Sequence, residues 1–214
     1  MPAVCDHRDS STWEHFANKG EGWPLTAQSD GVLADLCIHK SLEMAPRIRL
    51  AKDTYATTTH IVLPNDTNVL GNLMGGQLLN WMDIASAISA NRHCRRVVVT
   101  AAVNNVSFDR PIRLGDTVTI EAKVSRSFSS SMEVFMEVFV EDNATGERSK
   151  SNEAMYTFVA VDQLGAPIAV PELLPETDEE KQRFNGALRR RQLRLILAGK
   201  MEPKDATELK ALFD

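Results

Sequence analysis

The sequence predicts an α+β fold in which one long helix packs against an antiparallel sheet. One apolar stretch is long enough to form a buried helix. Several other stretches are rich in β-branched residues or alternate apolar with polar residues, as strands do, and short turns separate them. Short connections favour antiparallel neighbours, because a parallel pair needs a long crossover. These elements together indicate a layered α+β domain.

The predicted helix covers residues 74–93 and is apolar around most of its circumference, which is typical of a buried helix. Asp83 lies in its middle. A carboxylate in such surroundings loses hydration, so its presence suggests a functional role. The alternative is a carboxylate that meets solvent or pairs with an arginine. The apolar residues are Met74, Leu78, Leu79, Trp81, Met82, Ile84, Ala85, Ala87, Ile88 and Ala90.

The predicted strands follow from composition and alternation. In residues 132–141, Met and Val alternate with Glu and Phe, so one face of this strand is apolar and the other is mixed. Turn residues at 114–116 and 143–146 separate the strands. The five predicted strands are residues 55–63, 97–108, 117–127, 132–141 and 154–161.

Gly75 and Gly76 stand immediately before the helical stretch. Without β-carbons they allow a ligand to approach the main chain, and their N–H groups would point at an incoming carbonyl or anion. Seven residues separate Gly76 from Asp83, about two helical turns or roughly 10 Å on the same face. A long substrate could lie along that face. The alternative is that the glycines only form a tight turn.

The 214 residues carry a net charge of −5, which argues against a general nucleic-acid binder. Cys5, Cys37 and Cys94 lack metal-site spacing, so we expect free thiols in a reducing compartment and no zinc site. No apolar run approaches the roughly 18 residues of a membrane span. We therefore expect a cytoplasmic protein without a membrane span, a metal or a nucleic-acid partner.

The chain divides into an N-terminal extension (residues 1–50), a central domain (51–172) and a C-terminal helical extension (173–214). The first contains one helical pattern, at residues 32–44. In the C-terminal extension, Thr177 and Glu180 fit a capping box at the start of a helix, and Gly199 fits the residue that ends it. These signals frame a helix of about twenty residues. We expect its apolar residues to dock and its arginines to face solvent or another subunit, although a phosphate-binding role stays open. Residues 205–213 predict a short closing helix.

An ordered set of motifs closely resembles the acyl-CoA thioesterases of the hotdog fold, in the branch of the YciA-type and brain acyl-CoA hydrolase-type enzymes. The resemblance covers about residues 55–172. It implies a sheet wrapped around a central helix, and paired hotdogs that assemble into a hexamer as a trimer of dimers. The motifs are residues 64–72, Met74-Gly75-Gly76, Trp81-Met82-Asp83, Val106-Ser107-Phe108 with Pro111, Leu114-Gly115-Asp116 and residues 156–162.

The resemblance also implies a homo-oligomer whose active site lies between subunits, with Asn68 from one and Asp83 from the other. Asp83 would act on water as a general base or attack the thioester directly, while Asn68 orients the water. The backbone N–H of Gly76 or Gln77 would stabilise the oxyanion. No cofactor is required, since CoA is part of the acyl-CoA substrate and of the product.

For the coenzyme, the resemblance implies a position along the sheet near two segments, residues 129–131 and 148–151. Arg148, Lys150 and Arg110 are candidate phosphate ligands, and Ser130 and Ser131 belong to the first segment. The alternatives are that the serines cap a hairpin and that Lys150 faces solvent.

Two other functions remain as alternatives. One is a sensor that binds acyl-CoA without turnover. The other is a hotdog enoyl-CoA hydratase, whose Asp and His lie close together, whereas here the first histidine after Asp83 is His93. His93 and Cys94 do not suggest a Cys/His nucleophile, because adjacent helical residues point about 100° apart.

Overall fold

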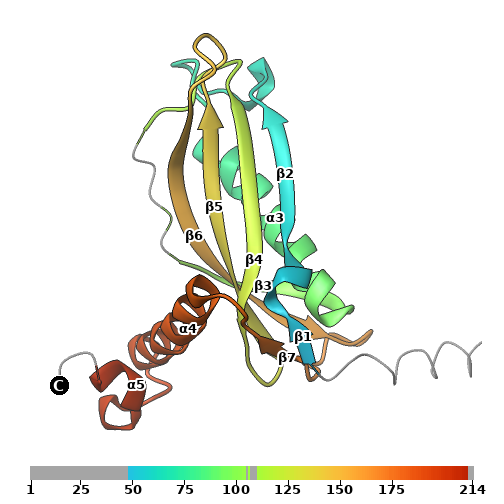
Figure 1. Ribbon diagram of the computed structural model, residues 1–214, viewed down its shortest axis with the longest axis vertical. Coiled ribbons are helices and arrows are strands. Elements are labelled where there is room, and N and C mark those ends of the chain that lie inside the picture. Colours follow the sequence, from blue (N-terminus) through green and yellow to red (C-terminus); the bar gives the residue numbers. More distant parts are fainter. Residues whose placement is uncertain (1–47, 105, 107–109, 212–214) are drawn as a thin grey trace, which may run out of the picture. The chain divides into compact units, whose positions relative to one another are not determined.

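The computed structural model describes residues 48–104, 106 and 110–211. A five-stranded antiparallel sheet curves around one long helix, α3 (Gly75–Cys94) (Figure 1). The strand order is β2-β4-β5-β6-β3. This arrangement confirms the predicted α+β class and the hotdog fold. The strands are β2 (Ala56–Ile61), β3 (Val97–Asn104), β4 (Thr117–Ser127), β5 (Ser131–Glu141) and β6 (Arg148–Val161).

Strand β6 begins six residues before the predicted strand at 154–161. Its first half, from Arg148 to Glu153, is polar and carries no local strand signal. This half nevertheless pairs with β5, from Glu141 opposite Arg148 to Glu137 opposite Glu153. Hydrogen bonding to a neighbouring strand therefore extends β6 through residues of low intrinsic preference. Strand β3 in turn ends at Asn104, short of the predicted residue 108.

The core lies between α3 and the inner face of the sheet. The residues of β5 that were predicted to form an apolar face, from Met132 to Val138, are fully buried there, and they meet Leu78, Met82 and Ala85 of the helix. Tyr156 and Phe158 of β6 are the largest fully buried side chains of this core. Alternation along the strands thus identified the inner face correctly.

The prediction that α3 is buried all round fails for the single chain. Ile84 and Ile88 are 45% and 38% exposed. On the adjacent edge strand β3, three valines are also 46–66% exposed, namely Val97, Val99 and Val103. We refer to these five residues as the α3–β3 strip. An apolar strip of this kind on one chain indicates a surface that another protein covers.

Helix α4 (Asp178–Leu197) confirms the predicted capping box, since the Thr177 side chain accepts from the Glu180 N–H. The prediction that its arginines face outward is wrong. Arg190 forms two hydrogen bonds to Glu133, and Arg183 bonds Glu137, both on the outer face of β5. These two arginines therefore point towards the sheet, because they pair with the glutamates on the outer face of β5.

Short elements complete the described part of the chain. Strand β1 (Ile48–Leu50) pairs in parallel with β7 (Glu172–Leu174), and the 3-10 turn η1 (Ala51–Thr54) leads from β1 to β2. The turn η2 (Pro64–Asp66) follows β2, η3 (Pro203–Asp205) follows α4, and α5 (Thr207–Lys210) forms part of the predicted closing helix. The helical pattern at 32–44 lies outside the described residues. None of the described helices combines the length and apolar character needed to cross a bilayer.

Candidate active site

Asp83 lies half-buried on α3, on the side that faces β3. Its Oδ1 accepts a hydrogen bond from the Thr100 hydroxyl at 2.7 Å, and no other donor in the described part of the chain is recorded for this carboxylate. Burial, with a smaller contribution from the nearby Asp83 charge, raises the pKa of Tyr156 to about 12. Asp83 is thus held by one hydroxyl, above a tyrosine that stays neutral, and keeps acceptor capacity for a substrate or water.

Thr100 carries no signal in the sequence that marks it as a site residue. A threonine within a β-branched stretch reads as an ordinary strand residue, and Thr100 is 17 positions from Asp83, so no local pattern joins them. The structure brings them together because β3 runs beside α3, and the register of β3 against β6 shifts between Thr100 and Ala102. An irregularity of this type can redirect a side chain near a functional site.

Asn68 is exposed at the start of a tight loop that precedes α3. Its Oδ1 accepts from the N–H groups of Leu70 at 2.9 Å and Asn72 at 3.3 Å, which fixes the side chain and leaves its NH₂ to donate outward. The loop turns at Gly71, which has φ = 74° and donates to the Asn68 carbonyl. No hydrogen bond joins Asn68 and Asp83 within one chain.

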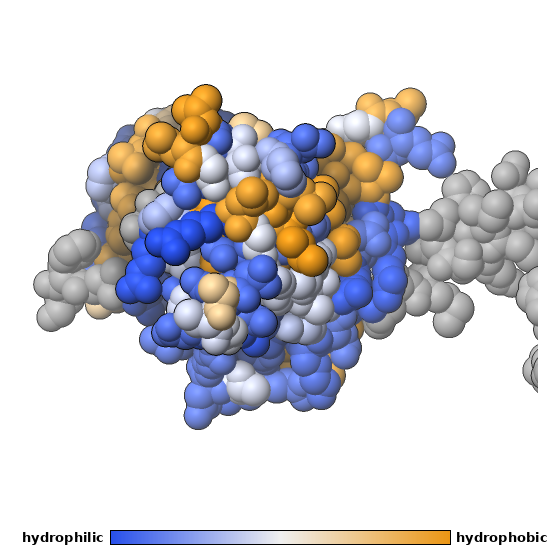
Figure 2. Space-filling view, turned by 90° about the horizontal axis from the view of Figure 1, so that it is seen from above, coloured by the Kyte–Doolittle hydropathy of each residue, from blue (hydrophilic) through white to orange (hydrophobic). Residues whose placement is uncertain are grey.

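The surface around the Asn68 loop carries several large exposed apolar side chains. Val69 and Leu70 are 102% and 79% exposed, and Leu63 and Leu114 on neighbouring loops are about half exposed. The view from above shows this mixture of orange apolar and blue polar surface at the end of the sheet (Figure 2). Asn68 therefore stands on a part of the chain that a single protomer leaves uncovered.

The two predicted oxyanion donors at the start of α3 differ in whether their N–H groups already donate a hydrogen bond within the chain. The Gln77 N–H donates to the Met74 carbonyl at 3.0 Å, so it is already used. For Gly76 no backbone partner is recorded among the described residues, Gly76 is exposed, and a Cβ built on it would meet nothing within 4 Å. Of the two predicted donors, Gly76 is the one free to bind a substrate oxygen.

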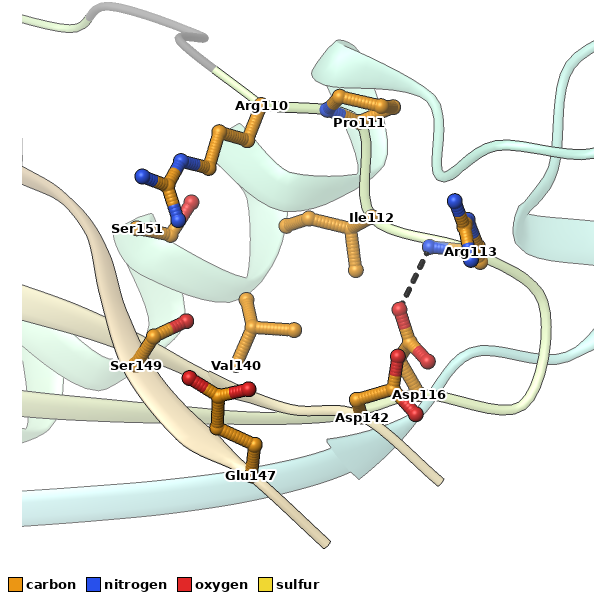
Figure 3. A pocket seen from close by; sticks show the side chains of 10 residues that line it. All are labelled: Arg110, Pro111, Ile112, Arg113, Asp116, Val140, Asp142, Glu147, Ser149 and Ser151. Atoms are coloured by element: carbon orange, nitrogen blue, oxygen red, sulfur yellow. Dashed lines mark hydrogen bonds between the residues drawn. The ribbon is translucent and has the colours of Figure 1, made fainter. Parts of the chain in front are cut away.

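Two neighbouring cavities of about 330 Å³ each flank this region. They share a wall formed by Arg110, Pro111 and Ile112. The Asn68 cavity is lined by that wall and by Asn68, Asn72, Leu73, Gly75 and Leu78. The Ser151 cavity is lined by the same wall and by Arg113, Asp116, Val140, Asp142, Glu147, Ser149 and Ser151 (Figure 3).

The predicted coenzyme-binding residues do not form one site within a chain. Ser131 pairs with Val159 at one end of β5, whereas Glu141 pairs with Arg148 at the other. Ten residues of strand, roughly 33 Å, therefore separate Ser131 from the level of Arg148. Ser130 lies in the turn beside Ser131. These residues could meet the same ligand only if they come from different protomers.

The predicted phosphate ligands differ in the charges around them. Arg148 bonds Glu121 at 2.9 Å, and Lys150 bonds both Glu137 and Glu153; these two bonds raise the pKa of Lys150. Arg110 lines both cavities, and no partner for its guanidinium is recorded in the described part of the chain. Arg110 is accordingly the candidate best placed to receive an anionic ligand.

His93 and Cys94 are structural. His93 is fully buried with Nε2 at 2.8 Å from the Pro171 carbonyl, and burial lowers its pKa. Burial also raises the pKa of the Cys94 thiol, which makes it a poor nucleophile. Among residues 48–104, 106 and 110–211, no cluster of three His, Cys, Asp or Glu side chains could hold a metal ion.

Comparison with known protein families gives one match in the centre of the chain. The family model described as the thioesterase superfamily matches residues 70–147. The uncharacterized acyl-CoA thioester hydrolase YkhA of Bacillus subtilis is 43% identical over 145 residues, which are 68% of this chain and 84% of YkhA. A cytosolic acyl coenzyme A thioester hydrolase of Rattus norvegicus is 36% identical over 151 residues, 68% of this chain but only 39% of the rat protein.

Solved structures show the same fold. An apo-hexameric acyl-CoA thioesterase superposes with a TM-score of 0.68 at 36% identity, over 71% of this chain and 97% of that chain. An acyl-CoA hydrolase of Staphylococcus aureus, in complex with butyryl coenzyme A, coenzyme A and coenzyme A disulfide, gives a TM-score of 0.65 at 32% identity, over 77% and 99%. Structures of that hydrolase with single alanine replacements concern an Asn, an Asp 15 residues later and a Thr 17 residues after the Asp.

Proposed function

Because this chain belongs to the hotdog-fold acyl-CoA thioesterases, we propose that Asp83 is its catalytic carboxylate, with Asn68 of a neighbouring subunit beside it. The enzyme hydrolyses the thioester of an acyl-CoA to a free carboxylic acid and CoA. The observation that carries the assignment is the hydrogen bond from Thr100 to Asp83 at an exposed apolar edge of the molecule.

The spacing of three residues supports the assignment. Asp83 follows Asn68 by 15 residues and Thr100 follows Asp83 by 17. The Asn, Asp and Thr replaced by alanine in the Staphylococcus aureus hydrolase have these same intervals. The spacing involves three residue types and two distances, so it is far more specific than any one of these residues.

The chemistry follows from the groups available. As a general base, Asp83 takes a proton from a water that the Asn68 amide orients, and the water oxygen bonds to the thioester carbon. The Gly76 N–H donates to the carbonyl oxygen as it becomes negative. The carbon–sulfur bond then breaks, and the thiolate of CoA recovers the proton from Asp83. In the nucleophilic route, an Asp83 oxygen attacks the thioester carbon and the carbon–sulfur bond breaks, which releases the thiolate of CoA and leaves an anhydride. Water then cleaves the anhydride to the free acid and the Asp83 carboxylate, and the proton that water gives up passes to the thiolate.

Two protomers are needed to assemble this site. In one chain, Asn68 is exposed among Val69 and Leu70, and Asp83 lies next to the uncovered α3–β3 strip. A two-fold dimer would cover the strip and create two equivalent sites, each with Asn68 from one protomer and Asp83 from the other. We propose that such dimers assemble further into a hexamer, as a trimer of dimers; a similar acyl-CoA thioesterase is described as hexameric.

For the coenzyme end, we retain Ser130, Ser131, Arg148 and Lys150 as proposed contacts. The distance between the two groups along β5 requires that one protomer supplies the serines and another supplies the cations. The ion pairs of Arg148 and Lys150 would have to rearrange to admit a phosphate. We further propose a cytoplasmic location, in keeping with the expected free thiols.

The sequence left two alternatives, a non-catalytic sensor and a hydratase. A sensor needs no carboxylate fixed by a hydroxyl, and the Asp83–Thr100 pair therefore favours catalysis. A hydratase needs a histidine near Asp83, but His93 is buried and bonded to Pro171.

The proposed function is tested with the purified protein, a panel of acyl-CoAs of increasing length and a thiol reagent that reports CoA. We expect CoA release by the wild type and a loss of at least about 100-fold in kcat for Asp83→Asn, since the isostere can neither accept the proton nor attack. The matched control is Asp178→Asn, an exposed carboxylate on α4, which should leave turnover unchanged. Absence of CoA release from every substrate would contradict the proposed function, and full activity of Asp83→Asn would contradict the choice of carboxylate.

A further inference from the structure

The Ser151 cavity is unusual for an enzyme whose substrate tail is a hydrocarbon. It borders the Asn68 cavity, because Arg110, Pro111 and Ile112 line both, so an acyl group in the Asn68 cavity lies next to it. The Asn68 cavity has an apolar floor of Leu73, Leu78 and Ile112, all nearly buried. Apolar methylenes fit the Asn68 cavity, and a group at the far end of the chain would meet the residues that the two cavities share.

Most acids of the Ser151 cavity are already satisfied by the backbone. Asp116 accepts from the Arg113 N–H at 2.8 Å (Figure 3). Asp142 accepts from the N–H groups of Ala144 at 2.8 Å and Thr145 at 2.9 Å, and these bonds lower the pKa of Asp142. Both carboxylates therefore already accept hydrogen bonds from the backbone of their own turns.

Arg110 has a different position. Its side chain extends into the cavity towards Ser151, and the Ser149 hydroxyl lies on the same wall. No acid in the described part of the chain pairs with its guanidinium, whereas Arg148, Arg183 and Arg190 all have carboxylate partners. An arginine that faces a cavity with two hydroxyls beside it can bind a carboxylate through two parallel hydrogen bonds.

Building on the proposed function, we propose that the Ser151 cavity binds a carboxylate at the far end of the acyl group, with Arg110 as its ligand. The preferred substrates are then ω-carboxyacyl-CoA thioesters, in which methylenes occupy the Asn68 cavity and the terminal carboxylate bonds Arg110 and Ser151. Glu147 lies further along the same cavity and would repel an anion placed deeper, so it limits the length of the chain.

A terminal methyl group is a poorer occupant of this cavity. It would cover the Arg110 guanidinium and the two serine hydroxyls and give them no hydrogen bond in exchange for water. A carboxylate restores those bonds, so the cavity discriminates between acyl chains of equal length by the polarity of their ends.

The other anions of the substrate are the phosphates of CoA. The whole pantetheine arm separates these phosphates from the thioester sulfur, whereas Arg110 lines the same cavity as Asn68, the residue proposed to orient the attacking water. An anion bound to Arg110 therefore lies beside the cavity that contains Asn68, which fits the acyl end of the substrate better than its nucleotide end.

The test compares hexanedioyl-CoA and octanedioyl-CoA with hexanoyl-CoA and octanoyl-CoA. We expect kcat/KM of the wild type to be about tenfold or more higher for the dicarboxylic member of each pair, the effect of one charge-assisted hydrogen bond. Arg110→Leu should abolish this preference by raising KM for the dicarboxylic substrates about tenfold more than for hexanoyl-CoA and octanoyl-CoA, while Arg110→Lys should keep part of the preference. The control Arg189→Leu, on α4 and outside both cavities, should keep the wild-type ratio.

Four results separate the possible failures. Equal kcat/KM values within each pair, or equal losses on all four substrates in Arg110→Leu, would overturn the inference alone. A loss of Arg110→Leu on hexanoyl-CoA that disappears with hexanoyl-pantetheine would make Arg110 a phosphate ligand and also overturn it. Hydrolysis of no thioester by the wild type would instead overturn the proposed function. If Arg110→Leu unfolds at a lower temperature than the wild type, Arg110→Gln replaces it in every comparison.

Discussion

The Thr100 hydroxyl is the one side-chain donor recorded for Asp83 in the described part of the chain, and it determines how that carboxylate is oriented. Because Thr100 touches Asp83 and not the thioester in the proposed mechanism, it is a positioning residue. Its contribution should therefore appear in the rate of the chemical step and much less in substrate binding.

We predict that Thr100→Val lowers kcat roughly ten- to hundredfold with little change in KM, since it removes one hydrogen bond to a charged group at nearly constant shape. Thr100→Ser should restore most of the activity. Steady-state kinetics of both variants, with thermal unfolding as a control for folding, makes the comparison. Equal activity of Thr100→Val and the wild type would show that the hydroxyl does not position Asp83.

The residues of the site differ in how far the sequence could predict them. Asp83 stands out locally, as a lone carboxylate in an apolar helix, and Gly76 stands out as half of a glycine pair. Thr100 has no local signal, because its role depends on the path of β3 past α3. Nor could the sequence choose between Gly76 and Gln77, because the hydrogen bond from Gln77 to Met74 appears only when the helix start is known.

Among the elements, α4 differs most from expectation. The outer face of β5 carries Glu133, which is only 4% exposed and also accepts from the Ser125 hydroxyl. Arg190 approaches this carboxylate as close as 2.6 Å, and the Arg183 guanidinium lies 3.8 Å from the centre of the Phe135 ring. Helix α4 is thus attached to the sheet by charged and aromatic contacts that a hydrophobic pattern cannot reveal.

We predict that Arg190→Ala lowers the free energy of unfolding by up to about 3 kcal/mol, because it leaves Glu133 buried without its cation. Arg190→Met combined with Glu133→Gln should recover part of the loss. Lys181→Ala, which removes an exposed ion pair on the same helix, should change stability by less than about 0.5 kcal/mol. Denaturant unfolding measures all three, and an effect of Arg190→Ala as small as that of Lys181→Ala would contradict a stabilising pair.

On the scale of the whole molecule, the proposed site spans two chains, since Asn68 and the α3–β3 strip are both uncovered in one protomer. The sequence predicted the layers and most strands, because alternation and turn residues are local. It could not distinguish an apolar helix face that meets the sheet from one that meets another protomer, since both have the same composition. Ile84 and Ile88 were therefore assigned to the core.

We predict that two inactive variants, Asn68→Ala and Asp83→Ala, recover activity when they are unfolded together and refolded. Each mixed dimer contains one site with both residues intact, so about a quarter of all sites should be active if the variants mix at random. Each variant refolded alone is the control. No recovery from a mixture that size-exclusion chromatography and mass spectrometry show to contain mixed dimers would place both residues in the same chain.

The parallel pair of β1 and β7 sets a limit on how far the chain can be shortened. Strand β1 has only three residues, yet it forms a parallel ladder with residues 172–174 and helps to cover Leu173, which is only 2% exposed. A truncated version that began at residue 51, where the sequence suggests that the central domain starts, would leave β7 without its hydrogen-bonding neighbour. Expression of the catalytic unit alone should therefore start no later than Ile48.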